Sequence, residues 1–354
     1  KYKAREDLVQ LIIDAGADVN LEYEVGWLFR KKRHIIDLAA TRANVAIFKL
    51  LLNSGAKIDP IKNAKWDNDP DNWNIVALAV IEAQDVEILK EVLSRLDKTA
   101  FVDVEGNTLL HYAVGCATDR AAFIKELIDF GFDADASAVR LNRSVHHKKN
   151  EIIPPPLISS LSGHIGLNRH YLSGPTHINN IKALLEKGAD VNIKNSEGMT
   201  ALHILSESFQ EGYSQDYIEK IELLRRFGSS IELRDNQGHT PLHLAALNGL
   251  PAIVSHLIKS GARTKIKSST GQTPLESALE RTIDEGSIPH SIVNYFETID
   301  AFSESGLWID KNLFLKHKSG LVQKLKKKIN EASAEQIKVL THSRTFKILN
   351  ETYL

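Results

Sequence analysis

The sequence predicts an all-α protein built from pairs of short helices that recur along the chain. The stretch Asp235–Lys267 shows one unit: Thr240-Pro241-Leu242 opens a first helix, Asn248-Gly249 ends it, and Gly261 ends a second helix. Proline is tolerated in the first helical turn, and glycine enters the left-handed conformation that ends a helix at little cost. Thr273-Pro274-Leu275 repeats the opening after 33 residues, and a fixed period of this size is typical of stacked repeats.

The same stretch contains the sequence Thr-Pro-Leu-His followed by an Ala-rich first helix. With its 33-residue period, it resembles the ankyrin-repeat family, whose repeats are a turn plus two helices. The resemblance covers about Asp7–Ile299 and implies an ankyrin-repeat solenoid of helix-turn-helix repeats with short β-hairpin fingers. It also implies a non-catalytic scaffold for protein–protein interaction through the fingers and the inner-helix face, with the partner left open.

A second pattern marks the end of the second helix in each repeat. Apolar residues stand seven, four and three positions before a terminal residue, except that Arg225 takes the third place before Gly228. This spacing places them on one helix face. The terminal residues are Gly16, Gly55, Leu96, Gly131, Gly188, Gly228 and Gly261. We therefore expect about seven repeats, with the first incomplete because Asp7–Ile13 is a second helix that no first helix precedes. At Leu96 a side chain resists the left-handed region, so that helix should end differently.

The chain is expected to divide into two parts. Residues 1–301 form the repeat array, and residues 302–354, which lack the repeat pattern, form a C-terminal helical extension or cap. An array needs a polar cap over its last repeat for solubility. Residues 302–354 hold 10 Lys/Arg against 5 Asp/Glu, with a cluster at Lys324 and Lys326–Lys328. A solvated helix face is the simpler interpretation of this cluster, and binding of nucleic acid or another anionic partner is the alternative.

Residues added to the 33-residue period fall in two kinds of loop. The connections between repeats, which form the fingers in ankyrin folds, gain 6 residues before Ile35, 7 before Ile75 and 12 before Pro156. The turns within a repeat gain 12 residues around Gly163–His177 and 7 around Phe209–Gln215. Insertions in repeat proteins map to loops and often to the binding face.

The fingers hold the residues that we predict to bind a protein partner. Aromatic and basic residues crowd the first finger, tryptophans flank an acidic run in the second, and Trp and Arg dominate the energetics of interfaces. Together with the tip that follows Asp235, the predicted residues are Trp27, Phe29, Lys31, Arg33, Trp66, Asn68, Trp73, Asn236, Gln237 and His239. The alternative is that the rings fold back over their own hairpins.

Histidines and glycines of the repeat pattern are assigned structural roles. The resemblance implies that the imidazole at the fourth place of Thr-Pro-Leu-His hydrogen-bonds the backbone of a neighbouring hairpin. These structural residues are His111, His203, His243, Gly188, Gly228 and Gly261.

No catalytic site, metal site or cofactor is predicted. Cys116 follows Gly115, where a small packing residue is expected, and a catalytic thiol would need a nearby His and a lowered pKa. An alternating run of aspartates at 67, 69 and 71 begins like a calcium loop, but Leu78 stands where the bidentate Glu belongs. The histidines in the loops lack the paired spacing and the cysteines of a zinc site. They are His146, His147, His164, His170 and His177.

Composition limits the compartment and the class of partner. The net charge of −1 argues against nucleic acid as the main partner, and no apolar run approaches the length of a membrane span. A single cysteine fits a reducing compartment. We expect a cytoplasmic monomer, and because the chain begins with Lys1 rather than Met, a fragment.

Two finer hypotheses remain open from the sequence. Irregular repeats with long insertions, a Lys/Ile/Asn-rich composition and an unrelated C-terminal extension resemble effectors of intracellular bacteria. Such a protein is secreted into the host cell without a cleavable signal peptide and acts on host proteins. The other hypothesis is a targeting module of a larger enzyme, whose catalytic domain lies outside this chain or includes Leu307–Leu354.

Overall fold

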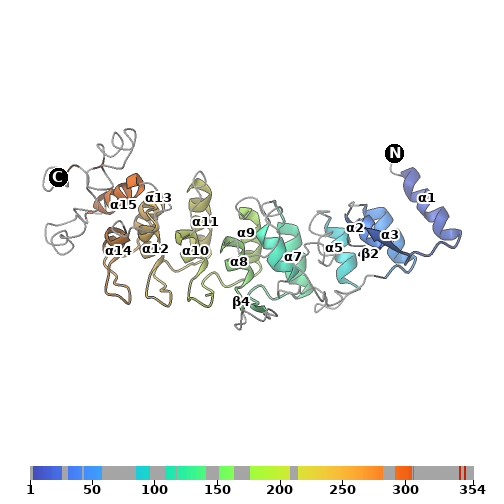
Figure 1. The fold of residues 1–354 in the computed structure, drawn as a ribbon, viewed down its shortest axis with the longest axis horizontal. Helices are drawn as coiled ribbons and strands as arrows, with labels where there is room; N and C mark the ends of the chain where they lie inside the picture. The colour runs from blue at the N-terminus through green and yellow to red at the C-terminus, as the bar shows by residue number, and fades with distance from the viewer. Residues whose placement is uncertain are drawn as a thin grey trace. The chain divides into compact units, whose positions relative to one another are not determined.

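The structure, a computed structural model, consists of helix pairs and two antiparallel hairpins (Figure 1). It describes residues 3–25, 31–41, 44–57, 85–95, 108–116, 118–140, 151–162, 176–207, 214–281 and 292–304, together with Gly306, Ser343 and Lys347. The chain forms two compact units, Lys1–Asp190 and Val191–Leu354.

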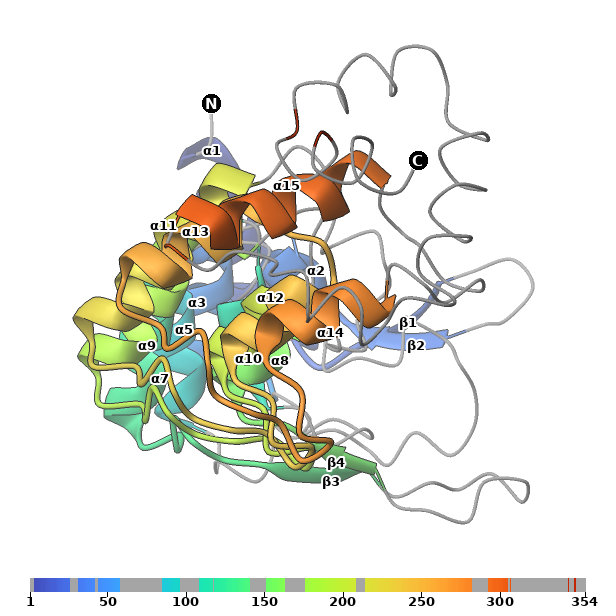
Figure 2. The same cartoon turned by 90° about the vertical axis from the view of Figure 1, so that its left-hand side faces the viewer.

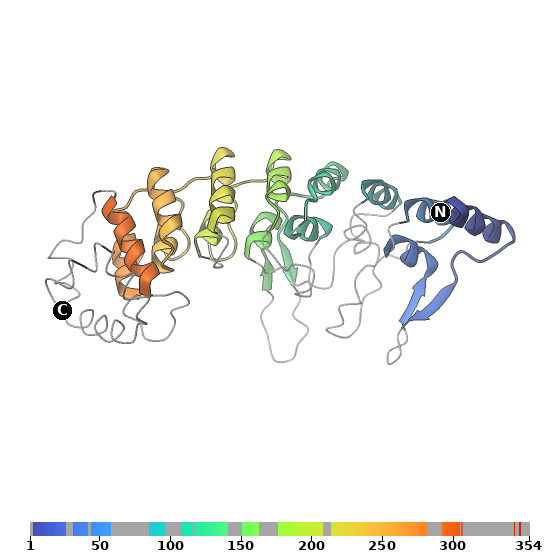
Figure 3. The same ribbon diagram turned by 90° about the horizontal axis from the view of Figure 1, so that it is seen from above.

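The first unit holds the helices that precede residue 190 and both hairpins. Its helices are α1 (Lys3–Asp14), α2 (Ile35–Thr41), α3 (Val45–Asn53), α5 (Val86–Leu93), α6 (Leu109–Gly115), α7 (Ala121–Phe130), α8 (Pro156–Ser162) and α9 (Ile178–Glu186). Its strands are β1 (Glu22–Val25), β2 (Lys31–His34), β3 (Ala138–Arg140) and β4 (Glu151–Ile153). Two of the three fingers predicted to be enlarged are therefore β-hairpins, and Figure 3 shows β1 and β2 projecting beyond α2.

The second unit is a two-layered stack of helices. Its helices are α10 (Ala201–Glu207), α11 (Ser214–Arg226), α12 (Pro241–Leu247), α13 (Pro251–Lys259), α14 (Pro274–Arg281) and α15 (Ile292–Glu304). The first helices α10, α12 and α14 pack side by side, and α11, α13 and α15 form the second layer. Figure 2 shows the finger loops extending from the side of the first helices.

The starts of the first helices follow the repeat pattern. Helix α12 begins at Pro241 with Thr240 as its N-cap, and α6 begins after Thr108 in the same way. Helices α10 and α14 begin at Ala201 and Pro274, directly after their own threonines. Each helix thus opens where the first turn is capped by a threonine and tolerates proline.

The ends of the second helices lie at the glycines of the pattern. Gly188, Gly228 and Gly261 have φ of 94°, 88° and 93°, which is the left-handed conformation that favours glycine. The apolar residues before them form the core; Leu184, Leu224 and Leu257, for example, are fully buried. Leu96 lies outside the described residues, and its helix α5 ends at Leu93 with Ser94 as the C-cap.

Helix α1 differs from the other second helices in its exposure. Leu8 and Ile12 are 55% and 48% exposed, whereas Ile253 and Leu257, at the same places in α13, are 0% exposed. Helix α13 packs against α11, α12 and α15, whereas the main contact of α1 is with α3. The sequence pattern therefore predicts which face of a helix is apolar but not whether that face is buried.

The predicted boundary between residues 301 and 302 falls within α15, which buries Phe296 and Phe302. The helices predicted beyond it, including the basic cluster at Lys326–Lys328, lie outside the described residues. The cap therefore stays a prediction.

Two glycines allow backbone strain to be separated from steric contact. Gly261 has φ of 93° with open space around an added Cβ, whereas a Cβ on Gly238 (φ 76°) would lie 2.7 Å from Ser269 N. We expect Gly261→Ala to cost about 1 kcal/mol from strain alone. Gly238→Ala should cost at least about 2 kcal/mol because the neighbouring finger must also move. Urea unfolding midpoints measure both, and equal losses would contradict close packing of the fingers.

Candidate functional site

The candidate site is the row of finger tips in the second unit, which are closed by side-chain hydrogen bonds. Asp235 Oδ1 accepts hydrogen bonds from the backbone N–H of Gln237 (2.9 Å) and His239 (2.7 Å). Asn195 Oδ1 does the same for Glu197 (3.0 Å) and Met199 (2.9 Å). Short polar side chains of this kind favour tight turns because they replace backbone partners. Each tip is thereby held in one conformation by its own sequence.

Successive tips are joined by backbone hydrogen bonds. Asn236 N donates to Glu197 O at 2.9 Å, and Ser269 N donates to Gln237 O at 3.0 Å. The amide of Asn236 also donates to Ser196 O at 2.9 Å. The glycine of each tip permits this approach, because a Cβ on Gly198 would lie 2.9 Å from Asn236 N. The fingers are consequently linked to one another as well as to their own helices.

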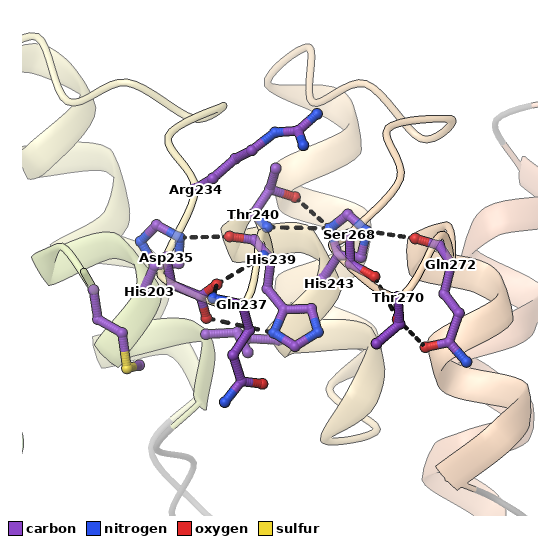
Figure 4. Close-up of polar contacts among 12 residues, drawn as sticks. His203, Arg234, Asp235, Gln237, His239, Thr240, His243, Ser268, Thr270 and Gln272 are labelled. Carbon is purple, nitrogen blue, oxygen red and sulfur yellow. Dashed lines mark hydrogen bonds and ion pairs between the residues drawn. The ribbon is translucent and has the colours of Figure 1, made fainter. Parts of the chain in front are cut away.

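A histidine in each of two repeats connects the start of a helix to the following finger (Figure 4). His243 Nδ1 lies 3.1 Å from Thr240 N and 2.9 Å from Thr240 Oγ1, and Nε2 lies 3.1 Å from Gln272 O. His203 makes the same contacts with Thr200 and, at 3.1 Å, with His239 O. The imidazole takes the place of the Glu that completes a capping box, while its second nitrogen reaches the next repeat.

These contacts define the protonation state of the two rings. Nδ1 accepts the N–H of the threonine, so the proton must lie on Nε2, where it is donated to a carbonyl oxygen. Burial lowers the pKa of His203 and lowers that of His243 from 6.5 to about 4. The neutral tautomer is therefore the form that fits the fold.

His111 makes the corresponding contacts in the first unit, where Nδ1 lies 3.2 Å from Thr108 N and Nε2 lies 3.2 Å from Pro154 O. In the last repeat the place is taken by Glu276, whose carboxylate accepts the N–H of Thr273 at 2.8 Å. A carboxylate caps its own helix but has no N–H to donate to a further finger.

The residues predicted to bind a partner are placed as follows. Asn236 and Gln237 are exposed at the tip, and His239 is half-buried, with Nδ1 3.4 Å from Asp235 Oδ2. Lys31 and Arg33 lie on β2, opposite Val25 and Tyr23. The other predicted residues lie outside the described part of the chain. They are Trp27, Phe29, Trp66, Asn68 and Trp73.

The tip residues were predicted from the sequence only in part. Asn236, Gln237 and His239 were predicted after Asp235, but Gly238 and the equivalent tip at Asn195–Gly198 were not. The signal was present, because Asn195–Gly198 and Asp235–Gly238 both precede a threonine by the same spacing. A polar residue followed at that distance by glycine is a recognisable turn pattern.

The residues weighed for catalysis or metal binding have structural contacts. Cys116 is buried, its thiol donates to Tyr112 O at 3.2 Å, and burial raises its pKa. His177 caps α9 by accepting the N–H of Asn179; His146, His147, His164 and His170 lie outside the described residues, as does the run of aspartates from 67 to 71. Within the described ranges no group of His, Cys, Asp and Glu could hold a metal ion. None of the described helices is long and apolar enough to cross a membrane.

Comparisons with known proteins show similarity to ankyrin repeats over part of the chain. A family model described as "Ankyrin repeats (3 copies)" matches residues 213–293, and one described as "Ankyrin repeats (many copies)" matches residues 170–207. Among solved structures, the crystal structure of the human ASB11 ankyrin repeat domain is similar, with a TM-score of 0.51 and 18% sequence identity over 77% of this chain and 97% of that one. At this identity the likeness concerns the fold alone. No curated protein matches the sequence.

Acidification is expected to destabilise the second unit through His243. The unfolded chain binds a proton near pH 6.5, whereas the folded ring binds it only near pH 4. The stabilisation is therefore complete above pH 6.5 and is lost as the pH falls toward 4. The 2.5-unit difference between 6.5 and 4 corresponds to about 3 kcal/mol at most.

Urea unfolding midpoints above pH 6.5 and near pH 4 measure this loss. The control is His243→Gln, which retains an acceptor for the capping box but does not titrate. The variant should lose less stability on acidification than the unmodified chain. Equal losses would show that His243 is not held in its neutral form.

Proposed function

We propose that this chain, an ankyrin-repeat protein with the all-α solenoid fold that its sequence predicts, binds a protein partner through the finger tips of its second unit. Ankyrin repeats are generally protein–protein interaction modules, and their fold is typically a non-catalytic scaffold. The finer assignment to the finger tips is supported by their geometry.

The observation that carries the proposal is the fixed display of polar side chains. Asn236, Gln237, Ser269 and Thr270 are exposed, yet their backbones are held by the turns and by the hydrogen bonds between tips. Within the described part of the chain, the side-chain amide of Gln237 has no hydrogen-bond partner. Because the backbone of the tips is already ordered, binding costs little backbone entropy, which is what makes a preorganised surface bind well.

The first helices of the second unit present little surface. All but the last residue of α10 and of α12 are buried. Their side chains pack within the stack rather than facing solvent. We therefore assign the contact to the fingers and not to the inner-helix face.

The outer helices of the first unit have charges that pair with one another. Nζ of Lys49 lies 3.7 Å from Glu87, Lys90 lies 3.3 Å from Glu126, and Lys125 lies 2.8 Å from Glu186. The hydrogen bond to Glu126 raises the pKa of Lys90, and that from Lys125 lowers the pKa of Glu186. Such surface pairs add little stability, but the charges in them already have partners within the chain. The surface of these helices therefore offers a partner less than the fingers do.

A finer proposal concerns the biological setting. Unequal repeat lengths and hairpin insertions such as β3–β4 support the effector class over a housekeeping scaffold. A reporter fused to the complete protein, followed in infected cells, tests whether it enters the host cytoplasm. Retention of the reporter in the bacterium would contradict this setting without affecting the binding function.

Affinity capture tests the proposed function directly. The chain is immobilised, exposed to a cell lysate, and the captured protein is identified by mass spectrometry and then titrated in purified form. We expect Asn236→Ala/Gln237→Ala to weaken its binding by more than about 1 kcal/mol. The control is Gln215→Ala/Glu219→Ala, which changes exposed residues of α11.

Both variants must first show unchanged circular dichroism and melting. A loss of affinity confined to the finger variant supports the function. A partner that is released by the α11 variant, or by neither variant, would contradict the assignment to the finger tips.

A further inference from the structure

Cations occupy one equivalent place in successive fingers of the second unit. Lys194, Arg234 and Lys267 each stand six residues after the glycine that ends a second helix, directly before the tip turn. All three are exposed. Equivalent positions of stacked repeats lie on the same edge of the stack, so these residues form a line along the fingers, which we call the cation row.

The cation row lacks carboxylate partners within the described part of the chain. Lys194 Nζ donates to the backbone oxygen of Arg234 at 2.8 Å. No described ion pair involves Arg234 or Lys267, and Figure 4 shows the Arg234 side chain extending away from the contacts of His203 and His243. This is the opposite of the outer helices, where the cations of α3, α5 and α7 each have a carboxylate within 4 Å.

The carboxylates closest in sequence to Arg234 already have hydrogen-bond partners of their own. Asp235 accepts the turn hydrogen bonds through Oδ1 and lies against His239 through Oδ2. Glu232 accepts the backbone N–H of Arg263 at 2.7 Å, with the guanidinium Nε of that residue 3.7 Å away. The finger of Lys267, residues 264–272, contains no carboxylate. The positive charges of Arg234 and Lys267 are therefore not neutralised by their own fingers.

We propose that the cation row binds an acidic, extended segment of the protein partner. Carboxylates of such a segment would form charge-assisted hydrogen bonds with the row, and a guanidinium such as that of Arg234 can bind a carboxylate through two parallel bonds. The inference rests on the function proposed above and specifies the chemistry of the partner.

The side chains beside the cation row favour binding of a peptide over binding of a nucleic acid. Exposed amides and hydroxyls lie at the tips beside the row, on Asn236, Gln237, Ser269 and Thr270, and these groups suit the N–H and C=O of an extended peptide. Single-stranded nucleic acids bind by stacking bases on aromatic side chains. The described fingers of this unit, residues 192–199, 232–239 and 264–272, contain no Phe, Tyr or Trp.

A direct binding measurement tests the inference. The probe is a fluorescein-labelled peptide of alternating glutamate and serine, titrated with the full chain at about 0.15 M ionic strength, where only charges closer than about 8 Å interact strongly. We expect Arg234→Glu/Lys267→Glu to weaken binding at least about tenfold.

The matched control is Arg226→Glu/Lys259→Glu. It changes the same two residue types and the same total charge at the exposed ends of α11 and α13. This control should change the affinity less than about twofold. A labelled single-stranded DNA of equal length is the second probe, and it should bind more weakly than the peptide.

Three results would overturn the inference: no binding of the acidic peptide, equal losses in the two charge-reversal variants, or tighter binding of the DNA. These results are distinct from failure of the proposed function. A captured partner that is released by Asn236→Ala/Gln237→Ala but not by the reversal of the row would leave the function intact and contradict only the acidic segment.

Discussion

The hydrogen bonds of one imidazole connect the helices of this structure to its fingers. Nδ1 of His243 caps the first turn of its own helix, and Nε2 donates to the following finger at Gln272 O. His203 does the same one repeat earlier, at His239 O. Because one ring makes both contacts, the helix start and the next finger cannot be displaced independently. The position of each tip thus follows from the cap of the preceding helix.

This coupling explains why the tips are suited to binding. A loop on a protein surface is usually mobile, and ordering it on binding costs free energy. Here the tips are ordered before any partner arrives, by the turns at Asn195 and Asp235 and by the bond from Ser269 N to Gln237 O. The exposed side chains are free to differ from repeat to repeat while the backbone stays the same. Specificity then depends on tip residues and on charges such as the cation row.

Much of the fold could be predicted because it depends on local chemistry. The starts of α12 and α14 follow from Thr-Pro, and the ends of the second helices follow from glycines such as Gly228 and Gly261, whose conformation disfavours other residues. Unequal repeat lengths correctly indicated fingers long enough to form the hairpins β1–β2 and β3–β4. These features need only neighbouring residues to form.

The features that sequence reasoning missed depend on partners far away in the chain. Asn180 stands where most other second helices have an apolar residue, and it is fully buried. Its side chain accepts from Arg120 N at 2.6 Å and donates to Cys116 O and Thr118 O, about sixty residues earlier. Lys220 occupies the same place in α11 and is also buried, although its ion-pair partner Asp216 lies only four residues away. No local pattern distinguishes these buried polar residues from surface ones. Likewise, no local pattern predicts which cations have no carboxylate partner among the described residues.

Amide hydrogen exchange of the second unit tests the central claim most directly. If the tips are held by the histidine link and by one another, the N–H groups of Asn236 and Ser269 should exchange as slowly as those within α12. His243→Gln should accelerate exchange around Ser268–Gln272, where Nε2 of the ring is lost, and leave Asn236 protected. Rapid exchange of Asn236 and Ser269 in the unmodified chain would contradict the claim that the binding surface is preorganised.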